Sequence, residues 1–351
     1  ASLLLADYAL TGTTDPEQVK QARGIYQHLA ERGDRQAQVK LGYLLEQGLG
    51  GKVNMEEASH WYELAANQDQ ATAQYLLGRL NQLGQLGQRP DYALAKQWYS
   101  RAMSNYAPAA VALGFIYETV DDNYQQALTA YESAANQFNV IGEFDLGLVY
   151  EYGKGRPVDH DKAEKLYKSA AERGYPRAMV QLAGLYVNDK NLRNERKAVK
   201  WYKKAANRGD RDALYQLGRL AEQGLGMSKD PVFALSQYQA SADKGNAKAM
   251  FALARMHQEG VGTAQNSEKA AELYKKLSQQ GNGYAQYQLA MLYVKGALGD
   301  ENKAEAKAWL KKAEHNGCVR AQHTLQWLNA ETSEDISFIE PLSLGVRRAG
   351  L

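Results

Sequence analysis

Aromatic residues followed four positions later by arginine are side chains through which this chain could bind a partner. Such pairs recur along the sequence, for example Tyr75 with Arg79, Tyr215 with Arg219, and Phe251 with Arg255. A spacing of four puts both side chains on one face of a helix. The ring would bury apolar groups and the arginine fork would bind carboxylates, so the pattern predicts recognition of a peptide that carries both.

The sequence contains no recognisable catalytic or metal-binding motif. Its six histidines are scattered without an H-E-x-x-H motif or paired ligand spacing, and no G-x-S-x-G elbow occurs. The glycine-rich stretch from Gly48 to Lys52 fails as a phosphate loop because Val53 follows the lysine. Carboxylates are dispersed and form no distinguishable acid/base pair. We therefore predict no catalytic residue, no metal and no cofactor, and expect that the chain is not an enzyme.

The charge balance gives no support for a nucleic acid or a membrane as partner. The 351 residues carry 42 basic and 40 acidic side chains, a formal net charge of +2. No apolar run is long enough to span a bilayer, so direct membrane insertion is not expected. Cys318 is the only cysteine, which rules out an intramolecular disulfide, and its surroundings favour a structural thiol over a reactive one.

The elements that position the aromatic and arginine side chains come from an internal repeat. A leucine followed by glycine or alanine returns at steps of 33 to 36 residues. The copies are Leu5-Ala6, Leu41-Gly42, Leu77-Gly78, Leu113-Gly114, Leu146-Gly147, Leu182-Ala183, Leu217-Gly218, Leu253-Ala254 and Leu289-Ala290, with Leu325-Gln326 as a degenerate tenth. Such regularity predicts a repeat solenoid.

Each repeat is expected to contain two helices. A stripe at helical spacing predicts a first helix, the A helix, as in Ala37, Leu41, Gly42 and Leu45. A glycine pair then supplies the positive φ of a tight turn, as in Gly48 and Gly50, Gly153 and Gly155, Gly224 and Gly226, and Gly260 and Gly262. A second stripe predicts the B helix, as in Ala58, Trp61, Tyr62, Ala65 and Ala66.

Each B helix is expected to end at a residue in the left-handed conformation. Glycine takes this place in most repeats, at Gly33, Gly174, Gly209, Gly245, Gly281 and Gly317. Asp69 and Asn105 replace it in two repeats, consistent with their tolerance of that conformation.

The consensus A-x-x-x-L-G-x-x-Y-x-x-G-x-G, then K-A-x-x-W-Y-x-x-A-A-x-x-G, resembles the Sel-one-like repeat family, relatives of tetratricopeptide repeats. The best match runs from Gly142 to Gly174, and the resemblance covers about residues 1–328. It implies an all-α fold, a right-handed α/α superhelical solenoid of about nine helix-turn-helix repeats plus a terminal helix. It also implies a binding adaptor without a chemical activity.

Two departures from the family pattern are visible. The repeat from Ala109 lacks the glycine pair and is three residues short, which predicts a tighter turn and a local change of curvature. The single Cys318 excludes the branch of the family that pairs cysteines within each repeat.

The ends of the chain suggest a fragment. We expect the solenoid to occupy residues 1–330 and a non-repeat tail to occupy 331–351, either as a cap or as the start of a following module. Ala1 enters in register with the repeat and no signal peptide is apparent, so we expect a piece of a longer array.

In relatives of this kind the A helices line the concave groove, and positions left free by the packing stripe would face it. The predicted partner-binding residues are Tyr75, Arg79, Phe144, Tyr215, Arg219, Phe251, Arg255 and Tyr287, with the greatest weight on the C-terminal half. Two structural alternatives stay open. The aromatic rings could wedge against the preceding repeat, and Arg219 could form an ordinary surface pair with Glu222.

These observations predict a non-enzymatic scaffold that binds a protein segment. The repeats look most like the enhanced-entry proteins of intracellular pathogens, which implies a bacterial periplasmic or secreted factor with a host protein as partner. An alternative is a targeting subunit for an envelope enzyme that cleaves peptidoglycan, or direct glycan binding through the aromatic row. A weaker one is a eukaryotic adaptor in membrane protein quality control.

Overall fold

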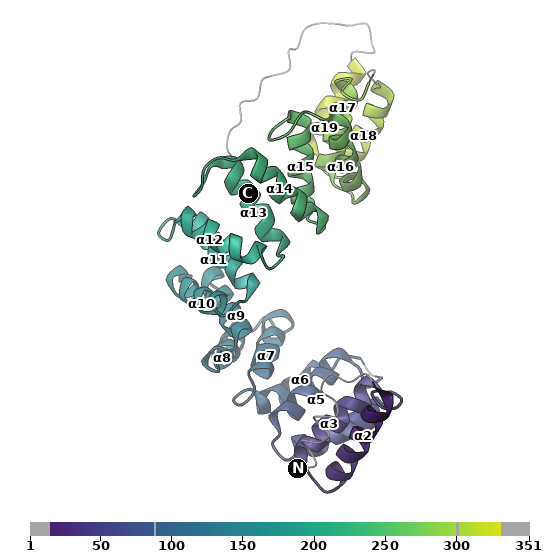
Figure 1. Ribbon diagram of the computed structural model, residues 1–351, viewed down its shortest axis with the longest axis vertical. Coiled ribbons are helices and arrows are strands. Elements are labelled where there is room, and N and C mark those ends of the chain that lie inside the picture. The colour runs from purple at the N-terminus through teal and green to yellow at the C-terminus, as the bar shows by residue number, and fades with distance from the viewer. Residues whose placement is uncertain (1–14, 88, 300–301, 331–351) are drawn as a thin grey trace. The chain divides into compact units, whose positions relative to one another are not determined.

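The computed structural model describes residues 15–87, 89–299 and 302–330 (Figure 1). Within these ranges the chain forms 18 α-helices and no strand. The predicted all-α fold is thereby confirmed for the described part of the chain. The first copy of the repeat, at Leu5, and the tail 331–351 lie outside the described residues.

The helices alternate between the two predicted types. The B helices are α2 (Pro16–Glu31), α4 (Met55–Ala66), α6 (Tyr92–Ala102), α8 (Tyr124–Asn136), α10 (His160–Glu172), α12 (Glu195–Ala206), α14 (Pro231–Asp243), α16 (Ser267–Gln279) and α18 (Lys303–His315). The A helices are α3 (Arg35–Gln47), α5 (Ala71–Leu83), α7 (Ala107–Thr119), α9 (Val140–Tyr152), α11 (Pro176–Asn188), α13 (Arg211–Gln223), α15 (Ala247–Glu259), α17 (Gly283–Val294) and α19 (Val319–Ala330).

The contacts divide the chain into two compact units. The first ends at Arg193 and contains α2 to α11, and the second begins at Asn194 and contains α12 to α19. Within each unit a helix packs mainly on its neighbours in sequence, as expected for a solenoid. No helix among the described residues is both long enough and apolar enough to cross a membrane.

The local signals that begin and end the helices act as the sequence predicts. Asn54, Asp159 and Asp230 cap B helices by accepting a hydrogen bond from the backbone amide three residues later. Every glycine of the four predicted pairs has a positive φ, and so has each glycine predicted to follow a B helix.

The expectation for the two non-glycine residues is half right. Asp69 adopts a left-handed conformation with φ of 57°, but Asn105 does not. The amides of Asn105 and Tyr106 both bond to the carbonyl of Ala102, so the chain leaves α6 through a right-handed turn that needs no positive φ. Phe138 instead takes the left-handed place in the next repeat, with φ of 55° and 75% exposure.

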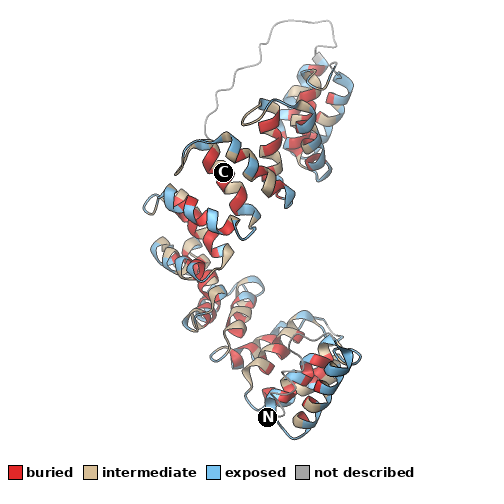
Figure 2. Ribbon diagram, viewed as in Figure 1, coloured by how far each residue is buried: buried red, intermediate tan, exposed pale blue. Residues whose placement is uncertain are grey.

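The core consists of small residues and leucines of the A helices packed against tyrosines of the B helices. Buried residues follow the sides of the helices that face their neighbours (Figure 2). A Cβ added to the glycine after the repeat leucine would lie 2.5 to 2.6 Å from the tyrosine ring of the next helix. These pairs are Gly42 with Tyr62, Gly78 with Tyr99, Gly114 with Tyr131, Gly147 with Tyr167 and Gly218 with Tyr238. Cys318 is buried in the same way between α17, α18 and α19, which supports its structural role.

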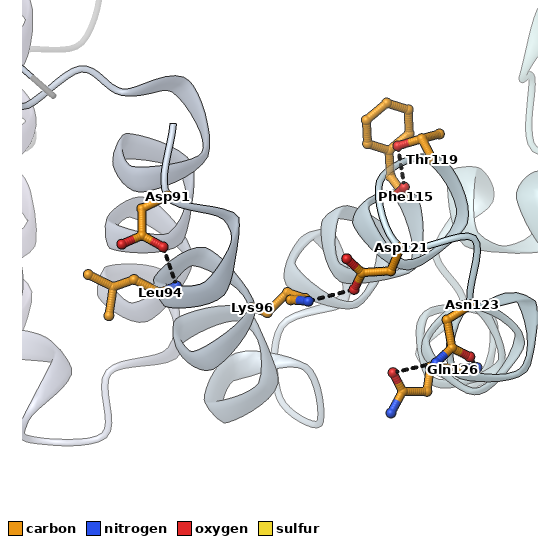
Figure 3. Close-up of polar contacts among 8 residues, drawn as sticks. All are labelled: Asp91, Leu94, Lys96, Phe115, Thr119, Asp121, Asn123 and Gln126. Atoms are coloured by element: carbon orange, nitrogen blue, oxygen red, sulfur yellow. Dashed lines mark hydrogen bonds and ion pairs between the residues drawn. The ribbon is translucent and has the colours of Figure 1, made fainter. Parts of the chain in front are cut away.

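The short repeat has the predicted tighter turn. Only residues 120–123 connect α7 to α8, whereas residues 153–159 connect α9 to α10. Lys96 of α6 reaches this turn and forms a 2.5 Å ion pair with Asp121 (Figure 3). Asn123 then caps α8 by accepting from the Gln126 amide at 3.1 Å.

Candidate partner-binding surface

In six repeats a tyrosine of the B helix is anchored to the A helix of the same repeat. The hydroxyl donates to a carboxylate or amide oxygen that lies four residues after the repeat glycine or alanine, at 2.7 to 3.0 Å. The pairs are Tyr62 with Glu46, Tyr99 with Gln82, Tyr131 with Glu118, Tyr167 with Glu151, Tyr238 with Glu222 and Tyr274 with Gln258. We call the A-helix member of each pair the acceptor residue. Acceptor residues hold the buried rings and are structural.

Three acceptor glutamates also bind a cation from the next repeat. Arg79 pairs with Glu46, Lys154 with Glu118, and Arg255 with Glu222. The Glu46 side chain is only 7% exposed, so the ion pair and the tyrosine hydroxyl together satisfy a nearly buried carboxylate. These contacts link consecutive repeats, and two of the three cations, Arg79 and Arg255, are residues that the sequence pattern predicts to bind a partner.

The predicted aromatic residues are mostly packed. Tyr75, Tyr215 and Phe251 are half-buried, and their ring centroids lie 5.4 to 5.8 Å from those of the B-helix tyrosines of the same repeats. Tyr287 is half-buried against the cluster around α18. These aromatic rings therefore pack on the B helix of their own repeat, and Tyr75 also packs on Tyr106 of the next repeat, with ring centroids 5.2 Å apart, and on the core cluster that includes the preceding repeat.

Phe144 needs a correction. Its ring is only 1% exposed, because it packs between Tyr167 and Tyr175 with the Arg177 guanidinium 4.8 Å from its centroid. Phe144 cannot present its ring to a partner in this arrangement. The repeat pattern places this aromatic residue outside the leucine stripe, but it contains no signal that Tyr175 covers the ring.

The three predicted arginines differ in what they already bind. Arg79 is paired with Glu46, and Arg255 binds both Glu222 and Glu259. Arg219 forms no ion pair among the described residues, and donates instead to the neutral side chain of Gln216 at 3.0 Å. The alternative pairing of Arg219 with Glu222 is wrong, since Arg255 takes that glutamate. Only Arg219 keeps the free charge that the prediction assumed.

Two exposed aromatic residues lie directly after the repeat glycine and were left out of the predicted set. Tyr43 of α3 is 46% exposed and Phe115 of α7 is 51% exposed. They hold the same repeat position as Arg79 of α5, between them in sequence. We call these three residues the A-helix face of the first unit. Their repeat position was visible in the sequence, but only the structure shows that it is more exposed than the position four residues before it.

A shallow cavity of about 370 Å³ lies in the first unit at the ends of α9 and α11. Its lining residues are Glu151, His160, Gly184, Leu185, Asn188, Asp189, Lys190 and Asn191. Nδ1 of His160 lies 2.5 Å from the Asp189 carboxylate, and Nε2 lies 3.3 Å from the Glu151 carbonyl. The hydrogen bond with Asp189 raises the pKa of His160, and the same contact lowers the pKa of Asp189. Sequence reasoning took His160 as isolated because its partner is 29 residues away.

The described residues contain no group of three or more His, Cys, Asp or Glu side chains that could hold a metal ion. The His160 and Asp189 pair therefore reads as a polar contact at the edge of a cavity.

The helices form pairs at a nearly constant period, and a small residue follows the repeat leucine in most of them. These features define an α/α repeat protein. Its exposed A-helix positions differ from one repeat to the next. Seven segments match the Sel1 repeat family, at 35–70, 71–105, 140–175, 176–210, 211–246, 247–282 and 283–318. The chain belongs to the Sel1 repeat family. The short repeat of α7 and α8 falls in the interval between two matches, in line with its missing glycine pair.

Two solved structures are similar over most of the chain. One is a protective antigen of uropathogenic Escherichia coli with an SLR fold, 30% identical, with a TM-score of 0.77, covering 91% of this chain and 68% of that one. The other is a Sel1 repeat protein from Oxalobacter formigenes, 26% identical, with a TM-score of 0.69, covering 93% of this chain and 94% of that one.

Among curated proteins, chitin synthase regulatory factor 3 of Schizosaccharomyces pombe is 28% identical over 221 residues. This match covers 59% of the chain and 24% of the relative. The chain therefore spans about a quarter of the length of that relative.

Proposed function

We propose that this chain is a non-enzymatic scaffold that binds a segment of a partner protein along its A helices. The observation that carries the proposal is the A-helix face of the first unit, where Tyr43 and Phe115 expose about half of their surface. Large exposed aromatic side chains at equivalent positions two repeats apart suit a peptide that follows the repeat direction. Arg79 lies between them in sequence but is neutralised by Glu46, so apolar contact carries the recognition there.

The second unit supplies a different chemistry. Arg219 of α13 is the predicted arginine that forms no ion pair among the described residues. Tyr215, one turn earlier on the same helix, is half-buried. An acidic side chain of the partner would bind Arg219 in the manner first predicted for the whole row. We therefore propose that the first unit binds an apolar segment through Tyr43 and Phe115, and that the second unit binds an acidic segment through Arg219.

The test is peptide selection on the immobilised chain followed by fluorescence anisotropy on the selected peptides. Tyr43→Ser combined with Phe115→Ser is expected to weaken peptides selected on the first unit at least ten-fold, on the order of 1.4 kcal/mol. The matched control is Leu64→Ser with Tyr92→Ser, which removes two B-helix side chains that are each 37% exposed. Equal losses from both double variants would count against binding on the A helices.

A second candidate function is regulation or targeting of an enzyme that builds or cleaves a cell-envelope polysaccharide, or direct glycan binding. The similarity to a chitin synthase regulatory factor favours it. Recovery of such an enzyme from an envelope fraction by the wild-type chain, but not by the Tyr43 and Phe115 double variant, would support the targeting role. Retention on glycan beads without added protein would support direct glycan binding.

We propose that the chain acts in the bacterial envelope or outside the cell, as a factor in contact with the host. The similarity to a protective antigen present in uropathogenic Escherichia coli strains motivates this proposal. Fractionation of the native organism with an antibody to this chain tests it, and a signal confined to the cytoplasmic fraction would contradict it.

A further inference from the structure

The spacing between acceptor glutamates and their cations provides an internal reference for the cavity at α9 and α11. Arg79 lies 33 residues after Glu46, and Arg255 lies 33 residues after Glu222. Both arginines directly follow the repeat glycine or alanine of the next A helix. An arginine at that position therefore reaches the acceptor glutamate of the preceding repeat.

Glu151 is the acceptor residue whose cation is missing. The equivalent position, again 33 residues later, holds Gly184, which has no side chain. Glu118 shows that another cation can substitute, because Lys154 binds it from the turn after α9. Within the described residues no lysine or arginine forms an ion pair with Glu151.

The cavity lies beside the two positions that such a pair would join. Glu151 and Gly184 both line it, together with Leu185 and the polar residues at the end of α11. The Glu151 carboxylate accepts from the Tyr167 hydroxyl at 2.7 Å. Burial raises the pKa of Glu151, and the hydrogen bond from Tyr167 and the charge of His160 oppose only part of this rise.

We infer that this cavity binds the arginine side chain of a partner segment, with its guanidinium on the Glu151 carboxylate. The chain itself uses arginine for the same contact at Arg79 and Arg255, and this identifies guanidinium as the matching chemistry. The inference rests on the proposed scaffold function and adds a basic anchor to the partner segment. Of the two carboxylates that line the cavity, Asp189 is paired with His160, whereas Glu151 has no lysine or arginine partner among the described residues, so Glu151 supplies the charge that would attract a cation.

His160 and Lys190 are the two basic residues that line the cavity. Both ring nitrogens of His160 are engaged, one by Asp189 and one by the Glu151 carbonyl, so the imidazole forms part of the wall. Lys190 is exposed at the rim. It competes with an incoming cation, and its removal is expected to strengthen binding.

The first experiment uses a small probe, so that it does not depend on a known partner. Saturation-transfer NMR is recorded with N-acetyl-arginine methylamide and with its neutral citrulline analogue on the wild-type chain. Transfer is expected for the arginine probe and not for the citrulline one. Equal transfer for both, or none for arginine, would overturn the assignment.

Two variants locate the probe. Glu151→Gln removes the charge but keeps an oxygen for the tyrosine hydroxyl, as Gln82 and Gln258 do in their own repeats. It is expected to lower the arginine signal at least five-fold. Gly184→Arg supplies the missing side chain and is expected to abolish the signal. Lys190→Ala is expected to leave the signal equal or larger. A signal that persists in Gly184→Arg, or falls in Lys190→Ala, contradicts the proposed location.

The repeat register is tested without any probe. Gly184→Arg is expected to raise the melting temperature more in the wild-type background than in the Glu151→Gln background, because the new ion pair exists only in the first. Equal shifts would refute the register argument. Neither result bears on Tyr43 and Phe115, so failure of the pocket and failure of the scaffold proposal are separate outcomes.

Discussion

Tyr238 and Glu222 are joined by a 2.9 Å hydrogen bond from hydroxyl to carboxylate, and this bond holds a buried ring against Gly218. A Cβ on Gly218 would lie 2.6 Å from Cε1 of that ring. The ring has little freedom to move away, since it is 1% exposed and anchored at its far end. The absence of a side chain at Gly218 is therefore a requirement of helix pairing.

Gly218→Leu is expected to lower the free energy of unfolding by about 1 to 3 kcal/mol or more through overpacking. Chemical denaturation followed by circular dichroism measures the change. Gly24→Leu is the control, because an added Cβ there meets nothing within 4 Å. A Gly218 variant as stable as the Gly24 variant would show that α13 and α14 separate without loss. Because repeats contact mainly their neighbours, the Gly218 variant is also expected to unfold in two transitions.

The two predicted arginines of the second unit, Arg219 and Arg255, are expected to affect stability differently when each is replaced by alanine. Arg255→Ala leaves the Glu222 and Glu259 carboxylates without their cation and should cost about 1 kcal/mol of stability. Arg219→Ala breaks one hydrogen bond to a neutral amide and should cost less than about 0.5 kcal/mol. Urea denaturation of the two single variants measures this difference, and equal losses would refute it.

For peptide binding, Arg219→Ala is expected to have a larger effect than Arg255→Ala. Arg219→Ala should weaken an acidic peptide by on the order of 1 to 2 kcal/mol, because its guanidinium is available to a carboxylate. Arg255→Ala should change affinity little. Lys203→Ala with Lys275→Ala on the B helices is the control. Loss of affinity in the control alone would place the partner on the opposite side of the helices.

The repeat pattern predicted the fold because its signals are local. Ala37, Leu41 and Leu45 lie within a few turns of one helix, and the glycines that follow act on their own backbone. The contacts of the candidate surface are not local. Glu46 and Arg79 are 33 residues apart, so their pairing emerges only when neighbouring repeats are aligned and their side chains compared.

Other features could not be found because the informative side chain is missing or displaced. The cavity lies at Gly184, where the equivalent positions of two other repeats hold Arg79 and Arg255. A search for chemically active side chains overlooks such a site, because glycine has none. Phe138 was missed because the short repeat obscures the alignment at the end of α8. Phe144 was misplaced because burial by Tyr175 depends on a residue beyond its own repeat stripe.

Phe138→Gly is expected to stabilise the chain by about 1 kcal/mol. A bulky residue in the left-handed region costs about 1 to 2 kcal/mol, and glycine does not carry this cost. The lost side chain is 75% exposed and contributes little burial. Thermal unfolding measures the gain. Gly174→Ala, at φ of 95° in the equivalent place, is the opposite control and should destabilise. No gain at Phe138 would indicate that its ring makes a stabilising contact in solution.

Stability is expected to fall with rising pH because of Asp145 on α9. Burial raises the pKa of this carboxyl to about 7, Arg177 partly opposes the rise and Glu118 adds to it. A folded pKa above the unfolded value means that the folded state holds the proton more tightly. The contribution is therefore fully present below the usual Asp pKa of 3.8 and is lost as pH rises through about 7. Asp145→Asn keeps the shape and removes the titration.

Above pH 7 the free energy of unfolding should be higher in Asp145→Asn than in the wild type, by on the order of 2 kcal/mol, and the difference should shrink toward pH 4. Urea denaturation at a series of pH values measures both curves. Asp161→Asn, at an exposed position in the first turn of α10, is the control and should follow the wild-type curve. Parallel curves for the wild type and Asp145→Asn would mean that the Asp145 carboxyl has the same pKa in the folded and the unfolded chain, which would refute the prediction.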